Sequence, residues 1–118
     1  MLNQIILVGR LVRDIQVHES ESGKKLATLT LAVPRSFKNR DGLYDTDFFD
    51  CTLWDQAALN TSNYCKKSDI LGIKGRIQSK LIEEDGKVIR NDIQIIVEKV
   101  TFLSNKKGSS NEVIQEEN

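Results

Sequence analysis

Strand-like runs separated by glycine turns dominate this chain of 118 residues, and they leave room for one helix. The runs are rich in β-branched, aromatic and apolar residues, which favour strands. They cover residues 4–12, 26–33, 47–54, 70–82 and 87–103. Short polar stretches separate several of them and end in Gly23, Gly42 and Gly86. Glycine accepts the positive φ of tight turns, so these stretches predict hairpin connections, the last through Asp85-Gly86.

One segment, residues 55–67, has helical character. Asp55 is a suitable N-cap, and two lysines at the end suit the negative end of the helix dipole. Ala58, Thr61 and Cys65 are spaced to form an inward stripe, and Tyr64 is expected on the buried side of the helix end. The sequence therefore predicts one short helix between the third and fourth strands.

Three glycines inside the strands, Gly9, Gly72 and Gly75, indicate bulges or sharply coiled strands. Five strands with one helix between the third and fourth is the order of a small Greek-key barrel, the OB-fold. We therefore predict an all-β fold with one short helix, a five-stranded Greek-key barrel of the OB type.

The domain is expected to cover residues 1–104, because periodicity ends there. Residues 105–118 are rich in Ser, Asn and Glu and are predicted to be a short disordered acidic tail. Three acids and no base lie in residues 108–118, so residues 1–107 hold 17 basic against 14 acidic side chains, a net charge of +3. That mildly basic balance alone would not assign the chain to nucleic acid.

Several function classes find little support in the sequence. No apolar run is long enough for a membrane span, and residues 5–8 are too short for a signal-peptide core, so a cytoplasmic location is expected. One histidine and no CxxC predict no metal site, and Cys51 and Cys65 are expected to be structural thiols. No catalytic triad or cofactor motif occurs, which argues against an enzyme. The acidic residues 83–85 leave a metal-dependent hydrolase as a distant alternative.

Large aromatics lie on the polar face of the third strand. Side chains alternate along a strand, so Phe49, Cys51 and Leu53 are expected to face the core. Phe48 and Trp54 then share the other face with polar residues. From the residues alone, two interpretations stay equally open: a surface that binds a ligand, or a face covered by loops or by another subunit.

Phe37 is a further aromatic in an unusual place, because it lies in the polar, basic loop "RSFKNRDG". Unpaired bases stack on aromatic side chains for about 1–3 kcal/mol each with little sequence preference, and nearby cations attract phosphates. Phe37, Phe48 and Trp54 are therefore candidates for a stacking platform that takes single-stranded nucleic acid.

Segments along nearly the whole body carry a family resemblance: "MLNQIILVGRLVRD", "LATLTLAVPRSF", "DFFDCTLWDQAALN", "KGRIQSKL" and "IIVEKVTFL". They resemble the single-stranded DNA-binding (SSB) proteins of bacteria and phages. The resemblance implies an OB-fold, a homotetramer, and single-stranded DNA that wraps over the protein through stacking and phosphate contacts. The family's stacking aromatics match Phe37, Phe48 and Trp54. Its basic positions along the fourth strand and after the helix match Arg76, Lys80 and Lys67.

The sequence departs from the family pattern at three places. Ile82 stands where a stacking aromatic is usual, and Asp50 stands on the predicted binding face where a base is common, which should weaken phosphate attraction. Family members dock replication and repair proteins through an acidic tip that closes with Pro-Phe. Residues 111–118, "NEVIQEEN", are acidic but lack that closing pair.

The leading hypothesis is sequence-independent binding and protection of single-stranded DNA in replication, recombination and repair, at the nucleoid. Stacking is assigned to the three aromatics, and phosphate attraction to a basic set: Arg35, Lys38, Arg40, Lys67, Lys74, Arg76 and Lys80. The alternative is an OB-fold protein-interaction adaptor of a replisome or primosome, whose exposed aromatics contact a partner protein. RNA binding is a third option, because stacking tolerates both sugars.

Overall fold

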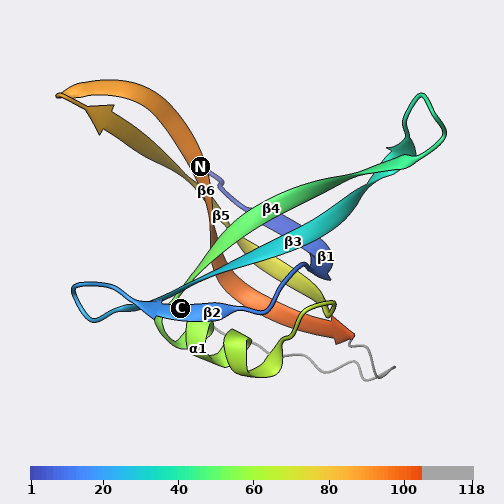
Figure 1. Cartoon of the computed structure of the whole chain (residues 1–118), viewed down its shortest axis with the longest axis horizontal. Helices are drawn as coiled ribbons and strands as arrows, with labels where there is room; N and C mark the ends of the chain where they lie inside the picture. The colour runs from blue at the N-terminus through green and yellow to red at the C-terminus, as the bar shows by residue number, and fades with distance from the viewer. Residues whose placement is uncertain (105–118) are drawn as a thin grey trace.

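The computed structural model describes residues 1–104, which form six strands and one helix (Figure 1). In chain order they are β1 (Ile5–Leu11), β2 (Gln16–Glu19), β3 (Lys25–Lys38), β4 (Tyr44–Trp54), α1 (Asp55–Tyr64), β5 (Ile70–Glu84) and β6 (Lys87–Ser104). All five predicted strands and the predicted helix are present. The three turn glycines have φ of 77–85°, and Asp85 at 53° with Gly86 at 77° gives the two positive φ values of a type I′ hairpin turn.

Five of the strands close into a barrel. β1 pairs antiparallel with both β3 and β5, β5 pairs with β6, and β3 pairs with β4. A short parallel pairing of β4 with β6, Cys51 opposite Ile95, closes the ring. The helix lies between β4 and β5 in the chain and covers one end of the barrel (Figure 1). This is the predicted five-stranded Greek-key OB barrel.

The short strand β2 was not among the predicted elements. It pairs antiparallel with β3 on the outside of the barrel, with Val17 opposite Ala27. Its sequence, "QVHE", holds one apolar residue in four, so hydrophobic periodicity gives no signal there. Pairing with the edge of β3 defines this strand, and its one apolar residue, Val17, is partly buried against the core.

The helix also differs from its prediction at both ends. Its N-cap residue is Trp54, with no side-chain capping bond, and Asp55 is the first helical residue with φ 52°. The helix ends at Tyr64, so residues 65–67 lie beyond it. The expected stripe of Ala58, Thr61 and Cys65 is buried. Tyr64 is 62% exposed, so the prediction that it is buried is wrong.

The barrel core is made by alternating residues of the closed strands. Fully buried large side chains include Leu11, Leu29, Leu31, Leu53, Leu71, Ile73, Val97 and Val100. Two long hairpins extend from this core in different directions (Figure 1). We call their outer parts the β3–β4 arm, residues 34–48, and the β5–β6 arm, residues 76–96. Within residues 1–104, no helix combines the length and apolar character needed to cross a membrane.

Each arm begins beside an irregularity in its pairing. The register of β3 with β4 shifts between Pro34 and Lys38, and the register of β5 with β6 shifts between Lys74 and Gly75. At the start of the β5–β6 arm, the side-chain amide of Asn3 bonds to the backbone of Ile77 in the way that a neighbouring strand would. Its Nδ2 donates to the carbonyl oxygen of Ile77 at 2.6 Å, and the Ile77 N–H donates to its Oδ1 at 2.9 Å. The N-terminal segment is thereby fastened to β5.

The two cysteines should be chemically inert in the folded protein. Cys51 and Cys65 are buried and free, and burial raises the pKa of each thiol to about 12. The thiolate is the reactive form, and at pH 8 roughly one thiol in 10⁴ would carry it. We expect no modification of the native protein by iodoacetamide at pH 8 and modification of both cysteines in denaturant. Rapid labelling of native protein would show that the barrel opens readily.

Candidate nucleic-acid interface

The alternation predicted along β4 is confirmed. Cys51 and Leu53 are fully buried and Phe49 is partly buried against the core. On the other face, Phe48 is 64% exposed and Trp54 is half-buried. Because β4 is paired with strands on both sides, its backbone is held in place and its outer side chains have defined positions.

A groove separates Phe48 from the β5–β6 arm. It has a volume of about 440 Å³, and its walls include Ile5 of β1, Ile77 of β5 and Ile93 of β6. Ile93 is 71% exposed and Ile77 is 39% exposed, so the groove between the two arms is open and mostly apolar, with the charged Asp50 in its lining. An aromatic ring on one wall and aliphatic side chains on the other suit a flat apolar ligand, which is what an unstacked base presents.

Trp54 marks the other end of this face, next to the β2–β3 turn. It shares a cavity of about 500 Å³ with Ser20, Ser22, Lys24 and Asp55. Lys24 therefore adds a cation beside the tryptophan, and sequence reasoning missed this lysine. No sequence signal pointed to Lys24, because the strand β2 that brings its turn to Trp54 was itself not predicted.

Asp50 is fixed by a hydrogen-bonded group on the same face. The hydroxyl of buried Thr30 donates to Asp50 Oδ1 at 2.6 Å, and Arg13 Nη1 donates to the Thr30 hydroxyl at 3.2 Å. Arg13 also lines a cavity of about 280 Å³ with β2 residues that include His18. Thr30 is thus the structural partner of Asp50. The Asp50 carboxylate was expected to weaken phosphate attraction, and Arg13 places a cation near it.

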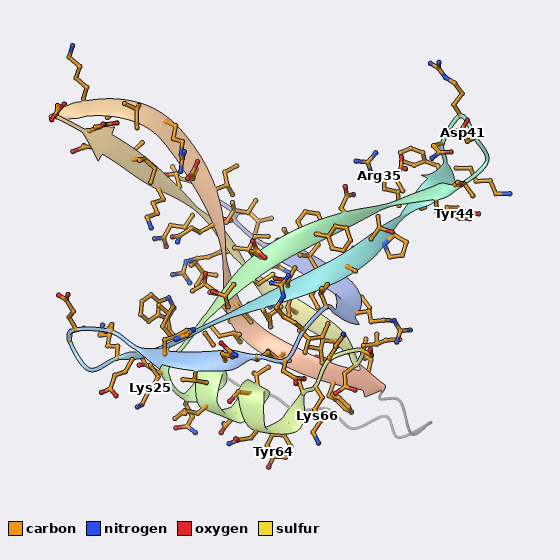
Figure 2. The ribbon with its side chains drawn as sticks, viewed as in Figure 1. Lys25, Arg35, Asp41, Tyr44, Tyr64 and Lys66 are labelled. Atoms are coloured by element: carbon orange, nitrogen blue, oxygen red, sulfur yellow. The ribbon has the colours of Figure 1, made fainter. Side chains whose placement is uncertain are left out.

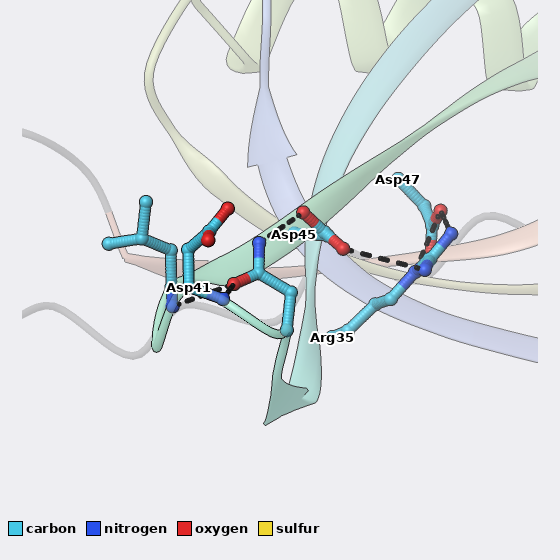
Figure 3. Close-up of polar contacts among 6 residues, drawn as sticks. Arg35, Asp41, Asp45 and Asp47 are labelled. Carbon is cyan, nitrogen blue, oxygen red and sulfur yellow. Dashed lines mark hydrogen bonds and ion pairs between the residues drawn. The ribbon is translucent and has the colours of Figure 1, made fainter.

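The predicted cations of the β3–β4 arm have different surroundings. Phe37 is 64% exposed at the far part of the arm, and Arg40 is exposed near the turn. Lys38 Nζ lies 5.8 Å from the centre of the Tyr44 ring, a cation–π distance. Figure 2 shows Tyr44 and Arg35 on different sides of the arm. Arg35 is engaged by the carboxylate of Asp47 (Figure 3).

The cations of β5 follow a single strand face. Lys74, Arg76 and Lys80 alternate along β5, and Arg76 is half-buried with its Nη1 3.4 Å from Glu98 Oε2. Lys74 lies opposite Ile6 of β1, farther along the barrel than the aromatic groove. Ile82, which replaces a family aromatic, is half-buried on the outer part of this arm.

Lys67 lies in the connection that follows the helix, away from both arms. Its backbone N–H donates to Asp14 Oδ1 at 2.7 Å, and Asp14 lines the same cavity as Arg13. The structure therefore places Phe37 and Phe48 on one arm, Trp54 at the other end of β4, and Lys67 beside the β1–β2 connection. Among residues 1–104, no three His, Cys, Asp or Glu side chains are grouped to hold a metal ion.

A closed Greek-key barrel with aromatics on the outer face of one strand, and cations beside some of them, defines the class of this chain. It is an OB-fold domain with an extended, aromatic-bearing surface.

Comparison with known proteins identifies the family. Residues 2–103 match the Single-strand binding protein family, and the chain belongs to it. It is 40% identical over 106 residues to single-stranded DNA-binding protein B of Bacillus subtilis, covering 90% of this chain and 94% of that protein. It is 39% identical to single-stranded DNA-binding protein 3 of Listeria innocua, covering 93% and 69%. The resemblance drawn from the sequence segments is confirmed.

A solved structure supports the fold independently. The crystal structure of a deletion mutant of the single-stranded DNA binding protein from Thermus aquaticus superposes with a TM-score of 0.73 at 21% identity. The match covers 89% of this chain and 52% of that one. At this identity the match establishes the shared OB-fold, and the side-chain roles depend on the surface described above.

Proposed function

We propose that this protein binds single-stranded DNA without sequence preference, by stacking bases on Phe37, Phe48 and Trp54 while cations attract the phosphates. The observation that carries the proposal is the exposed Phe48 on the face of β4 that also holds Trp54, beside an open apolar groove. Membership in the Single-strand binding protein family supports it. Coverage of unpaired strands is what replication, recombination and repair require, and we propose that the protein acts in these processes in the cytoplasm, at the nucleoid.

The phosphate contacts are proposed for the seven predicted cations and for two further cations near the aromatic face, Arg13 and Lys24. The domain that binds is proposed to be residues 1–104, which the family match over residues 2–103 supports. The predicted acidic tail, residues 105–118, lies outside the described residues.

A fluorescence titration tests the binding proposal, because Trp54 is the chain's only tryptophan. Oligo-dT should quench Trp54 emission saturably, and duplex DNA at the same nucleotide concentration should not. Oligo-U in a parallel titration separates DNA binding from general single-strand binding. If no oligonucleotide changes the emission or the anisotropy of a labelled strand, the proposal is rejected, and the adaptor function becomes the better explanation of the exposed aromatics.

The affinity for single strands should fall as salt is added. Each phosphate contact releases condensed counterions, and for single strands log K changes by about −0.7 per contact for each decade of salt. Four or five contacts per bound strand would therefore give a slope of about −3. The measurement is the same titration at several NaCl concentrations. A slope near zero would remove the cations from the mechanism and leave stacking alone.

A homotetramer is proposed on the family resemblance, and exposed apolar residues support it. Ile6 and Val8 of β1 are 65% and 51% exposed on one strand face, a pattern that favours contact with another subunit. Sedimentation should give about four times the 13.4 kDa of one chain. If the protein sediments with the mass of one chain at all micromolar protein concentrations, the tetramer is contradicted and the DNA-binding proposal is unaffected.

A further inference from the structure

Arg35 is surrounded by carboxylates on the β3–β4 arm. Its Nε lies 3.1 Å from Asp47 Oδ2 and its Nη2 lies 2.9 Å from Asp47 Oδ1, a two-pronged contact (Figure 3). The remaining nitrogen, Nη1, lies 3.8 Å from Asp45 Oδ2. All three nitrogens of the guanidinium therefore have a carboxylate as a neighbour.

Asp45 is itself held in place by the turn of the arm. Asn39 Nδ2 donates to Asp45 Oδ1 at 3.1 Å, and Asn39 Oδ1 accepts the backbone N–H groups of Asp41 and Leu43 at 2.9 and 3.0 Å. A continuous series of hydrogen bonds and ion pairs therefore runs from the turn through Asn39 and Asp45 to Arg35 and Asp47 (Figure 3). The carboxylates around Arg35 are positioned by the fold of the arm, not by chance contact of long side chains.

The charges of the arm cancel. Residues 34–48 hold three cations, Arg35, Lys38 and Arg40, and three carboxylates, Asp41, Asp45 and Asp47. A guanidinium grips a carboxylate and a phosphate with the same pair of N–H groups. Asp47 therefore occupies the Nε–Nη2 edge of Arg35, and Asp45 lies beside Nη1, so a backbone phosphate of DNA would meet a carboxylate at either edge.

We propose that Asp47 is an intramolecular competitor for the phosphate site of Arg35, so that DNA must displace a carboxylate before Arg35 contributes to binding. The inference rests on the proposed function. The ion pair is open to exchange, because the two side chains are 44% and 37% exposed and such surface pairs are weak. The hydrogen bond to Asp47 raises the pKa of Arg35, and the same bond lowers the pKa of Asp47, so both groups keep their charges at neutral pH.

The competition has a consequence for selectivity. A neutral arm offers little attraction to polyanions in general, so contact there depends on bases that stack on Phe37. Asp47 thus sets the balance between stacking and phosphate attraction on this arm. Its removal should add a phosphate contact without changing the aromatic surface.

Oligo-dT titrations of four variants test the competition. D47N keeps the shape of the side chain and removes its charge, and we expect about five-fold tighter binding at moderate salt and a salt slope steeper by about 0.7. D41N is the matched control, because it removes the same charge from the same arm and Asp41 has no ion pair with Arg35 among the described contacts. Its effect should stay below about two-fold.

Variants of Arg35 distinguish two causes of tighter binding by D47N. One is the release of Arg35 from Asp47, and the other is the general loss of a negative charge. In the R35Q background, D47N should change affinity no more than D41N does in the wild type. Equal effects of D47N and D41N, or an equal effect of D47N with and without Arg35, would overturn the inference. Weaker binding by D47N would also overturn it and make Asp47 a positioning residue for Arg35.

Failure of the proposed function has a different signature in this experiment. If the wild-type protein does not bind oligo-dT, both the function and the competition are rejected. If the wild type binds and D47N matches D41N, only the competition is rejected. Thermal melting of each variant confirms that the compared proteins are folded.

Discussion

Replacing Gly75 with alanine should destabilise the barrel severely, by about 3 kcal/mol or more. A Cβ at this position would overlap the carbonyl oxygen of Ile96 and lie 3.2 Å from the Cα of Val97. Both are backbone atoms of the paired strand β6, so no side chain can move to make room. The expected drop in melting temperature is about 10–20 °C for a domain of this size.

Gly72, three residues earlier on β5, is the matched control. A Cβ there would meet Leu103, Val8 and Thr101 side-chain atoms at 3.7–3.8 Å, which is ordinary van der Waals contact. G72A should therefore change stability by less than about 1 kcal/mol. Equal melting temperatures for G75A and wild type would mean that β6 yields at Ile96 and that the register shift is not rigid.

The position of Gly75 explains why so much depends on it. It lies at the register shift between β5 and β6, just before the β5–β6 arm leaves the barrel. A bulge bends its strand and increases its twist, so close approach of the two backbones here directs the arm. The arm supplies Ile77 and Ile93 to the groove beside Phe48. Stability at Gly75 is therefore coupled to the shape of the candidate interface.

The parts of the fold that follow from local pattern could be predicted. Alternation in β4 placed Phe48 and Trp54 on one face and Cys51 on the other, because a strand with one buried face has a period of two. Glycines at turns, including Gly86, followed from the need for positive φ. Each of these inferences uses residues that are neighbours in the chain.

The parts of the fold that depend on pairing between residues far apart in the chain could not be predicted. β2 exists because β3 offers it an edge, and its own residues carry no periodic signal. Asp14 accepts a hydrogen bond from the backbone of Lys67, 53 residues away, a contact that no local window of sequence reveals. Tyr64, the last residue of the helix, is exposed, whereas Cys65 just beyond the helix end is buried, and the local pattern does not distinguish the two positions.

Charge in the candidate site shows the same limit. Arg35 has the appearance of a free phosphate contact in the basic loop, and its partner Asp47 comes twelve residues later on the next strand. Only the hairpin register brings the two together. Counting cations near an aromatic therefore overstates the phosphate attraction of this arm. Lys24 was overlooked because β2 was not predicted, and Arg13 was overlooked because its contact with Thr30 joins residues 17 positions apart.

The double variant F37A/F48A should lose most of its affinity for single-stranded DNA while remaining folded. Both side chains are 64% exposed, so their removal leaves no large cavity in the core. If each stacks one base, the combined loss is about 2–6 kcal/mol, which is at least about 30-fold in the dissociation constant. Trp54 is kept in this variant, so the same quenching titration reports binding.

Y64A is the matched control for that variant. Tyr64 is 62% exposed, and it lies on α1 at the end of the barrel away from both arms (Figure 2). Loss of an equally exposed aromatic there should leave affinity within about two-fold, because Tyr64 is not part of the proposed stacking surface. If Y64A and F37A/F48A weaken binding equally, exposed aromatic area in general is responsible. If neither weakens it while salt still does, phosphate contacts carry the binding and the β4 face has another partner, which would favour the adaptor function for its aromatics.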